Sequence, residues 1–406
     1  MEASRNFKED FPLLMDNPVA YLDNAATAQR PRCVLDAERD FYCRHNANPL
    51  RGLYALSVEA TEELENARAA VQTFIGAAEP EEIIFTRNTT EGLNLVAYSY
   101  GLSRVHAGDE ILVSVMEHHS NLLPWQMVYR QTGASLRFLE CEPDGHLDLD
   151  KAAQMITDRT RIVAVTQLSN VLGQIYPIRE LAALAHAKGA VIVVDGAQST
   201  PHIPVDVRAL DADFIAFSGH KLYGPMGIGV LYGRRALLDA MPPFLTGGEM
   251  IESVSRESAV FAELPHKFEA GTVNAAGAAG LHAALRYVRG IGFDVIRQRE
   301  QELSSYAFAR MHGIPHVHIL GSAQPEQHNG ILTFTLDGVH PHDISEILAA
   351  DGVAVRAGHH CAQPLLHHLG VSATVRASIA FYNTADDVDR FIGSLSTVRE
   401  RMGYGK

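Results

Sequence analysis

The chain has 406 residues, of which 47% are hydrophobic, and its formal net charge is −14 at pH 7. A prior of roughly 100–200 residues per domain predicts two domains, and this hydrophobic content allows large buried cores. Nucleic-acid binding depends on Lys and Arg that neutralise phosphates, so the acidic balance argues against an extended nucleic-acid interface. We therefore expect a globular protein that acts on a small molecule.

The N-terminus alternates charges, whereas a signal peptide needs a basic start and an apolar core. No later stretch approaches the ~18 unbroken apolar residues of a membrane span. The four cysteines, Cys33, Cys43, Cys141 and Cys361, form no C-x-x-C pair, which is typical of free thiols in a reducing compartment. We therefore expect a cytoplasmic protein without disulfides or a membrane segment.

From about residue 58, helical and strand patterns alternate along the chain. Apolar residues from Val58 to Phe74 recur at helical spacing after Ser57, which we interpret as an N-cap. Helix-length segments such as 91–99 and 178–188 separate Val/Ile-rich runs that predict strands at 82–86, 110–115, 161–167, 190–194, 213–217 and 228–232. This alternation predicts an α/β fold with a mostly parallel central sheet that helices cover on both faces.

Beyond about residue 265 the pattern changes to that of a smaller α+β domain. Two helices are predicted at 275–290 and 293–312, and strands near 331–336, 353–356 and 374–380. A final amphipathic helix begins at Thr384, with Asp387 three residues on as a capping box. The predicted organisation is an N-terminal segment (1–20) that packs with the small domain, a large domain (21–265) and a small C-terminal domain (266–406).

Polar residues that directly follow apolar runs are candidates for a ligand site, because open α/β sheets bind ligands at the carboxyl ends of their strands. Asp195 ends the run at 190–194, and Gln198 comes three residues later. An Asp there can pair with a pyridinium nitrogen, which makes pyridoxal phosphate an electron sink, and Gln198 can reach the ring hydroxyl. The alternative is that Asp195 only caps the next helix, and this segment alone leaves both open.

The run at 213–217 ends in Ser218-Gly-His220-Lys221, which is the stronger signal. A lysine that binds a cofactor aldehyde is expected at a strand end, where desolvation and nearby cations lower its pKa. Ser218 and His220 can hold the phosphate of the same cofactor. A surface lysine in a Gly/Pro loop is the ordinary interpretation of a single lysine, but it explains this cluster poorly.

Residues 87–92 supply a helix N-terminus, where free backbone N–H groups and the helix dipole favour an anion. Thr90 precedes the helix predicted at 91–99 and can offer a hydroxyl and an amide together to a phosphate. The doublet of His118 and His119 follows the run at 110–115 and can place an imidazole over a pyridine ring. A histidine doublet is more often structural. We interpret this one as part of a ligand site only because the other candidate residues accompany it.

The order of these residues resembles the class V aminotransferase family of fold-type I pyridoxal-phosphate enzymes. Five further segments look like group II cysteine desulfurases, namely Tyr21-Leu-Asp-Asn-Ala-Ala, Glu117-His-His-Ser-Asn-Leu-Leu-Pro-Trp125, Ser169-Asn170-Val-Leu-Gly173, Phe268-Glu-Ala-Gly-Thr272 and Arg356-Ala-Gly-His-His-Cys361-Ala. The last motif distinguishes a desulfurase from an aminotransferase. The resemblance covers nearly the whole chain.

The resemblance implies a role for each matching residue. Lys221 would bind the cofactor covalently, Asp195 and Gln198 would meet the ring nitrogen and ring hydroxyl, and His118 would stack on the ring and take part in catalysis. The phosphate would be held by Thr89, Thr90, Ser218, His220 and, from the neighbouring subunit of a homodimer, Thr272. Substrate would be bound by Asn170, Arg356 and Arg376, and an Arg fork suits an amino-acid carboxylate.

The implied activity is the conversion of L-cysteine to L-alanine with a persulfide on Cys361. A SufE-like or SufU-like acceptor protein would then take the sulfur for iron–sulfur cluster or other thio-cofactor assembly. His359 and His360 can promote a thiolate at Cys361 if they are protonated or hydrogen-bonded. Two alternatives stay open, a class V aminotransferase with an incidental cysteine and selenocysteine as a substrate.

A metal-binding scaffold built on the histidine doublets is a third alternative from another class of protein. The sequence has no H-E-x-x-H motif and no paired C-x-x-C motif to support it. We therefore expect no metal site.

Overall fold

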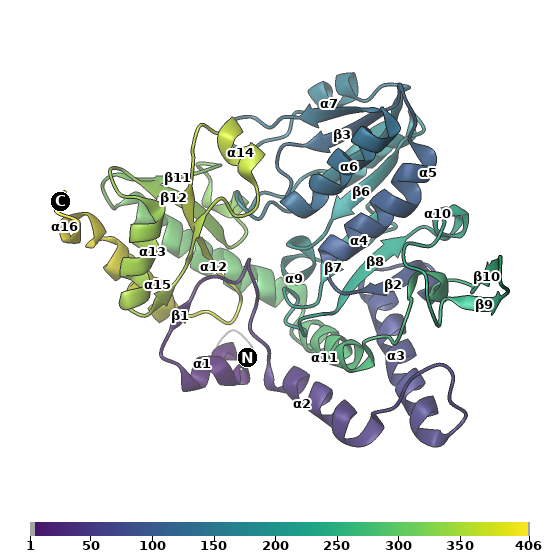
Figure 1. The fold of residues 1–406 in the computed structure, drawn as a ribbon. Coiled ribbons are helices and arrows are strands. Elements are labelled where there is room, and N and C mark those ends of the chain that lie inside the picture. The colour runs from purple at the N-terminus through teal and green to yellow at the C-terminus, as the bar shows by residue number, and fades with distance from the viewer. Residues whose placement is uncertain (1–4, 405–406) are drawn as a thin grey trace.

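The computed structural model describes residues 5–404 of the chain. A seven-stranded sheet forms the centre of the larger part of the molecule (Figure 1). The strand order is β2-β8-β7-β6-β5-β3-β4. The strands are β2 (Ile83–Thr86), β3 (Glu110–Ser114), β4 (Ser135–Leu139), β5 (Thr160–Thr166), β6 (Val191–Asp195), β7 (Phe214–Ser218) and β8 (Gly229–Gly233). Within this sheet β8 alone runs antiparallel to its neighbours, so the predicted mostly parallel sheet is confirmed.

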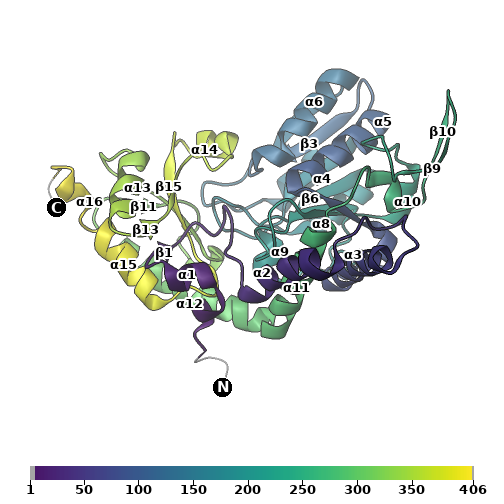
Figure 2. The ribbon, with the colours of Figure 1, turned by 60° about the horizontal axis from the view of Figure 1, so that its bottom comes forward.

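Successive residues of each central strand point into two different cores. Ile192 and Val194 face the core shared with α3 (Ala55–Phe74), α8 (Ile178–His186) and α11 (Ala275–Ile291). Val191 and Val193 face the core shared with α4 (Thr89–Leu95) and α6 (Leu123–Thr132), which cover the opposite face (Figure 2). Because side chains alternate along a strand and both faces are covered, the strands appear in the sequence as unbroken apolar runs.

A four-stranded antiparallel sheet lies at the other end of the molecule (Figure 1). Its order is β11 (Val317–Ile319), β12 (Ile331–Leu336), β15 (Thr374–Ser378) and β14 (Arg356–Gly358). The helices α12 (Phe293–His312), α13 (Pro341–Ala350) and α15 (Ala385–Leu395) share its core. This is the predicted smaller α+β unit, and the fold as a whole is the expected α/β fold.

The N-terminal segment contacts both parts of the molecule. The rings of Phe7 and Phe381 lie 5.4 Å apart edge-on, and Phe11 packs in the same way against Tyr287 of α11. A short parallel pair then joins β1 (Ala20–Tyr21) to β13 (Val353–Ala354). The predicted association of residues 1–20 with the small domain stays a proposal, which the contact of Phe7 with Phe381 supports.

The helix α11 packs against α3 and against α2 (Arg32–Asp40), on the side of the large sheet. By contrast, α12 packs against α15 and the small sheet. The sequence pattern placed a domain boundary at residue 265, before both of these helices. From the packing we propose that the boundary lies near Gly292, between α11 and α12.

The start of α3 differs from the prediction. Its N-cap is Tyr54, which makes no side-chain capping bond, so the interpretation of Ser57 as the N-cap is wrong. The Ser57 hydroxyl instead donates to the Asn48 carbonyl (2.6 Å) and accepts from the Gly52 N–H (3.1 Å). The Ser57 hydroxyl therefore forms hydrogen bonds within the loop before α3 instead of capping the N-terminus of the helix.

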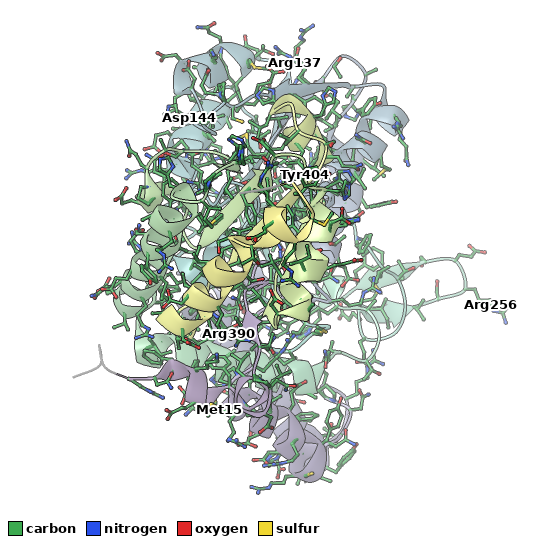
Figure 3. The ribbon with its side chains drawn as sticks, turned by 90° about the vertical axis from the view of Figure 1, so that its left-hand side faces the viewer. Met15, Arg137, Asp144, Arg256, Arg390 and Tyr404 are labelled. Atoms are coloured by element: carbon green, nitrogen blue, oxygen red, sulfur yellow. The ribbon has the colours of Figure 1, made fainter. Side chains whose placement is uncertain are left out.

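A two-stranded hairpin of β9 (Ile251–Val254) and β10 (Ala259–Phe261) projects from the large domain, and Figure 3 shows Arg256 at its tip. Most of its residues are exposed. Within residues 5–404, no helix combines the length and the apolar character needed to cross a membrane.

Candidate active site

Twelve of the thirteen predicted site residues line a single cavity of about 210 Å³. It lies where β5, β6 and β7 end, and residues of β14 and β15 complete its wall from the small domain. The predicted residues in its lining are Thr89, Thr90, His118, Asn170, Asp195, Gln198, Ser218, His220, Lys221, Arg356, Cys361 and Arg376. The fold thus gathers side chains that are up to 287 positions apart in the sequence.

Lys221 and Asp195 share this cavity from the ends of neighbouring strands. Burial lowers the pKa of Lys221 to about 8, while the charge of Asp195 opposes that shift and Arg376 supports it. Burial also raises the pKa of Asp195, against the hydrogen bond that its Oδ1 accepts from the Ala197 N–H (2.9 Å). A neutral amine is therefore accessible near neutral pH, and a ligand cation beside Asp195 would offset the effect of its burial.

Three buried polar atoms of residues in the cavity wall, Gln198 Oε1, Arg376 Nε and His360 Nδ1, have no hydrogen-bond partner among the described residues, and the first two bear on the ligand. Gln198 donates through Nε2 to the Ala25 carbonyl (2.7 Å), but its Oε1 is unpaired. Arg376 Nε is unpaired in the same way. Buried donors and acceptors in native proteins are almost always satisfied, so these two atoms point to a ligand with a hydroxyl near Gln198 and an acceptor near Arg376.

The N-terminus of α4 lies against the end of β7. The Thr89 N–H donates to Ser218 Oγ (2.8 Å), and the two hydroxyl oxygens lie 2.6 Å apart. Gly229 on β8 permits this approach, because a Cβ there would lie 2.6 Å from the Cα of Asn88, the N-cap. Hydroxyl and amide donors therefore gather at a helix N-terminus, which favours a phosphate.

His220 borders the same donors. Its Nδ1 lies 3.2 Å from the Thr27 hydroxyl. Burial, with the nearby charges of Lys221 and Arg30, lowers the pKa of His220 to about 4. The imidazole is therefore neutral at physiological pH and would contact a phosphate through a hydrogen bond rather than through charge.

His118 is held in one tautomer. Its Nδ1 accepts from the Ser120 N–H (3.1 Å), so the proton of the neutral ring lies on Nε2. Burial and then the charge of Lys221 lower the pKa of His118 to about 3. The Ser120 hydroxyl lies 3.0 Å from His118 Nδ1 and 2.7 Å from Thr90 Oγ1, and thus links the two predicted residues. The sequence pattern did not single out Ser120, since a serine beside a histidine doublet carries no distinctive signal.

Arg356 and Arg376 are directly opposed on β14 and β15. The Arg376 guanidinium is buried and donates to the Asn170 carbonyl (3.0 Å) and to Asp23 Oδ1 (3.2 Å). Arg356 Nε lies 3.6 Å from the other oxygen of Asp23. Opposed like charges are unfavourable unless anions lie beside them, so Asp23 balances part of this charge and a substrate carboxylate would balance more. Sequence reasoning missed Asp23, which lies two residues after the short strand β1.

Cys361 lies in the loop between β14 and α14 (Gln363–His368) and is exposed. The expectation that His359 and His360 promote its thiolate stays a prediction, but burial disfavours a protonated His360. Burial lowers the pKa of His360 to about 3, so the ring is neutral, and its Nε2 pairs with the Thr374 hydroxyl (2.8 Å). The fold buries this histidine, which its position in a Gly/Pro-flanked loop did not indicate.

Thr272 is the one predicted residue that the described chain does not bring to the cavity, and it is exposed. A larger hollow of about 880 Å³ lies elsewhere, between β4 and β11, and none of the predicted residues lines it. Within residues 5–404, no group of three His, Cys, Asp or Glu side chains is placed to hold a metal ion. The chemistry of the chain therefore centres on the smaller cavity.

A lysine, an acidic residue at a strand end and a helix N-terminus around one cavity of an α/β fold define the class of pyridoxal-phosphate enzymes. The model of the family Aminotransferase class-V matches residues 20–391, and the chain belongs to this family. The predicted resemblance is thus confirmed.

Full-length relatives are known by sequence and by structure. The chain is 47% identical to a probable cysteine desulfurase of Halalkalibacterium halodurans over 99% of both chains. It superposes with a TM-score of 0.94 on a cysteine desulfurase from Thermococcus onnurineus, at 41% identity over 99% of each chain. The cysteine desulfurase CsdA of Escherichia coli gives a TM-score of 0.91 at 42% identity, over 97% of this chain and 98% of that one.

The residues of the cavity fit pyridoxal phosphate, the cofactor of this family. The Lys221 amine suits the aldehyde, and the buried Asp195 suits a protonated ring nitrogen. The unpaired Gln198 Oε1 suits the ring hydroxyl. The donors at the start of α4, with Ser218, suit the phosphate. Each group of the cofactor thus has a partner of matching chemistry.

Proposed function

We propose that this protein is a cysteine desulfurase that converts L-cysteine to L-alanine and retains the sulfur on Cys361. The observation that carries the proposal is the composition of one cavity wall, in which Lys221, the pair Arg356 and Arg376, and the Cys361 loop meet. An aminotransferase needs the first three of these residues but has no use for a thiol at that place. The identity to named cysteine desulfurases over the full length supports the same conclusion.

The cofactor-side residues act on protons. When bound, pyridoxal phosphate supplies an electron sink that acidifies the Cα hydrogen of the substrate and weakens its Cβ–S bond. Asp195 would hold a proton at the ring nitrogen, and His118, which lines the same cavity, would have its Nε2–H available as a donor. The Lys221 amine takes the Cα proton. Its pKa of about 8 leaves a fraction of the amine neutral near physiological pH, and only the neutral amine can accept a proton.

The substrate-side residues orient the amino acid. Arg376 offers its unpaired buried Nε to the carboxylate, and Arg356 approaches from the neighbouring strand. Asn170 presents its carbonyl to Arg376 and its side-chain amide to the Cys361 loop, so it links the two. Selenocysteine presents the same carboxylate, amine and Cβ geometry, and we propose it as a second substrate.

In the sulfur step the Cys361 thiolate attacks the sulfur of the substrate. A new S–S bond forms while the Cβ–S bond breaks, and the electron pair left on carbon is protonated to give alanine. The overall change is cysteine plus Cys361–SH to alanine plus Cys361–S–SH, which balances without an oxidant. A thiol of an acceptor protein, SufE-like or SufU-like, then attacks the outer sulfur and regenerates Cys361.

We further propose that the protein acts as a cytoplasmic homodimer for iron–sulfur cluster or other thio-cofactor assembly. The exposed position of Thr272 outside its own cavity supports the dimer, because it leaves that side chain free for the cofactor of a second copy. Exposed cysteines at positions 33, 43 and 361 suit a reducing compartment.

The test is to incubate the purified holoenzyme with cysteine and a reducing thiol and to measure alanine and sulfide together. Equal amounts of the two products are expected. Cys361→Ala should form almost no alanine from cysteine, whereas Cys43→Ala, which removes another exposed thiol, should match wild type. Alanine formed by Cys361→Ala at the wild-type rate would show that Cys361 is not the sulfur acceptor. Transfer of the amino group to a 2-oxo acid would favour the aminotransferase alternative.

A further inference from the structure

The backbone of the Cys361 loop is in an unfavourable conformation. His360 and Cys361 have φ angles of 51° and 55°, so two consecutive residues with side chains occupy the left-handed region. Such residues keep this conformation only where surrounding contacts impose it, and they concentrate at functional sites. The contacts that hold this loop therefore determine where the thiol lies.

Those contacts come from the large domain on both sides of the thiol. The His119 N–H donates to the Cys361 carbonyl (2.7 Å), and the Gln363 N–H donates to His119 Nε2 (3.3 Å). From the other side, the Asn170 side-chain amide donates to the His360 carbonyl (2.8 Å). His119 alone thus contacts the backbone at Cys361 and again two residues later.

The turn that carries His119 is itself firmly held. It is the short 3-10 helix η6 (His119–Asn121), anchored by the fully buried carboxyl of Glu117. That carboxyl accepts from the Asn121 side-chain amide (2.6 Å) and from the Thr166 N–H (2.7 Å) at the end of β5. Because His118 and His119 are adjacent in this turn, one side chain reaches the cofactor cavity while the next faces the Cys361 loop.

We propose that His119 is a positioning residue that fixes the Cys361 loop against the cofactor cavity, with its Nε2 as the acceptor that holds the loop at Gln363. The inference rests on the proposed role of Cys361 in accepting sulfur. His119 does not line the cavity proposed to hold the substrate and the cofactor. Its loss therefore slows the transfer of sulfur to Cys361 and leaves proton removal from Cα intact.

The acceptor role requires an unprotonated Nε2, since an imidazolium has no lone pair to accept the Gln363 N–H. The titratable groups that face His119 are His118 in its own turn and, across the domain contact, His359. Burial and then the charge of His359 lower the pKa of His119, which keeps Nε2 available at neutral pH. The contact is present above the usual pKa of histidine and is lost as the pH falls through the lowered value.

The experiment compares two steps in holoenzyme variants. Single-turnover persulfide formation is followed by mass spectrometry of the Cys361 peptide, and Cα proton removal is followed by exchange of substrate hydrogen with deuterated water. His119→Leu should slow persulfide formation about tenfold, as expected for one lost hydrogen bond, with exchange changed less than about twofold. His119→Gln, whose amide oxygen can accept from the Gln363 N–H, should restore most of the rate.

His367→Leu is the matched control, because His367 is an exposed histidine of α14 in the segment that follows Cys361. It should match wild type in both steps. A second readout is the ratio of the persulfide rates of wild type and His119→Gln, which should fall as the pH is lowered, since only the histidine titrates. This ratio cancels every pH effect that the two proteins share.

Three outcomes would decide against parts of this account. A wild-type rate of persulfide formation in His119→Leu overturns the positioning role. An equal loss of Cα exchange and of persulfide formation in this variant also overturns it, because it would show that His119 supports the structure of the whole site. Wild-type protein that makes alanine with no persulfide on Cys361 overturns the proposed function instead. The persulfide measurement in wild type separates that failure from the other two.

Discussion

Burial in one cavity sets the ionisation of the residues that are proposed to do the chemistry. It lowers the pKa of Lys221 to about 8 and that of His118 to about 3, and it raises the pKa of Asp195. A bare cavity thus disfavours charge on all three side chains, although Asp195 and Lys221 partly compensate each other. A cofactor with a cationic ring nitrogen and an anionic phosphate supplies the opposite charges that this environment lacks.

We expect capture of pyridoxal phosphate by the cofactor-free protein to accelerate with pH and to level off above about pH 8. Only the neutral Lys221 amine is nucleophilic, and its fraction rises through the lowered pKa of about 8. The measurement is the visible absorbance of captured cofactor between about pH 6.5 and about pH 9.5, a range in which an ordinary lysine stays mostly protonated. Lys221→Ala is the control and should show no such phase. A flat profile, or a borohydride tag on another lysine, would contradict this assignment.

Asp195→Asn should preserve the fold and reduce Cα hydrogen exchange with deuterated water by about a hundredfold or more. The amide fits the same space but cannot stabilise a proton on the ring nitrogen as a carboxylate does. Cofactor content and thermal unfolding of the variant serve as controls for binding and folding. Near-normal exchange would mean that Asp195 serves only to accept the Ala197 N–H.

At the scale of elements, the site residues lie at the ends of strands and helices. Where these elements end therefore matters more for the site than how long they are. The last residues of β6 and β7 provide Asp195 and Ser218, and α4 begins beside them. The small sheet contributes through the cross-strand pair of Arg356 and Arg376. Two sheets with separate cores thus meet at one cavity, and the orientation of the small sheet determines where the two arginines lie in its wall.

The capping box of α15 gives a test at this scale. The Thr384 hydroxyl accepts from the Asp387 N–H (3.2 Å), and the Asp387 carboxylate accepts from the Thr384 N–H (3.1 Å). Thr384→Ala should lower the free energy of unfolding by about 1 kcal/mol. Urea or thermal unfolding measures the change. Thr73→Ala is the matched control, because Thr73 is an exposed threonine inside α3 and makes the same chemical change without a cap. If the two substitutions changed the free energy of unfolding equally, the loss of the cap would not explain the effect of Thr384→Ala.

At the scale of the whole molecule, an exposed surface lies around the segment that carries Thr272. The Gly271 N–H donates to the Gly248 carbonyl (2.9 Å), which ties this segment to the base of the projecting hairpin. Large apolar side chains are exposed on that hairpin, such as Val254 and Val260, and Leu53 is fully exposed. Exposed apolar side chains in such numbers favour a protein interface.

Subunit complementation tests the dimer directly. In a homodimer, Lys221→Ala and Thr272→Ala disable different sites, because each cavity would use Lys221 of its own chain and Thr272 of the other. Co-expression of the two variants should therefore give mixed dimers in which one cavity is complete. The expected result is wild-type cofactor retention in about half of the cavities of the mixed dimer, with sedimentation at low concentration as the check on mass. An active monomer, or no recovery on mixing, would contradict the arrangement.

Much of the fold and of the site could be predicted from the sequence because their signals are local. Apolar runs gave the central strands, and Asp195, Ser218 and Lys221 directly follow two of those runs. The capping box at Thr384 was also correct, since both of its partners lie within four residues. Ser57 shows the limit of local reasoning, because its hydroxyl is used by Asn48 and Gly52 in a loop folded back on the helix.

The sequence by itself determined the α/β class, the family and twelve residues that the fold gathers in one cavity, because strand periodicity and residue types after strand ends are properties of neighbouring positions. The tertiary structure alone decided how those residues are charged and held. It buried His360 against Thr374, placed Asp23 between two arginines and set His119 against the Cys361 loop. Each of these facts depends on contacts between segments far apart in the chain, and burial and hydrogen bonding arise only when such segments meet.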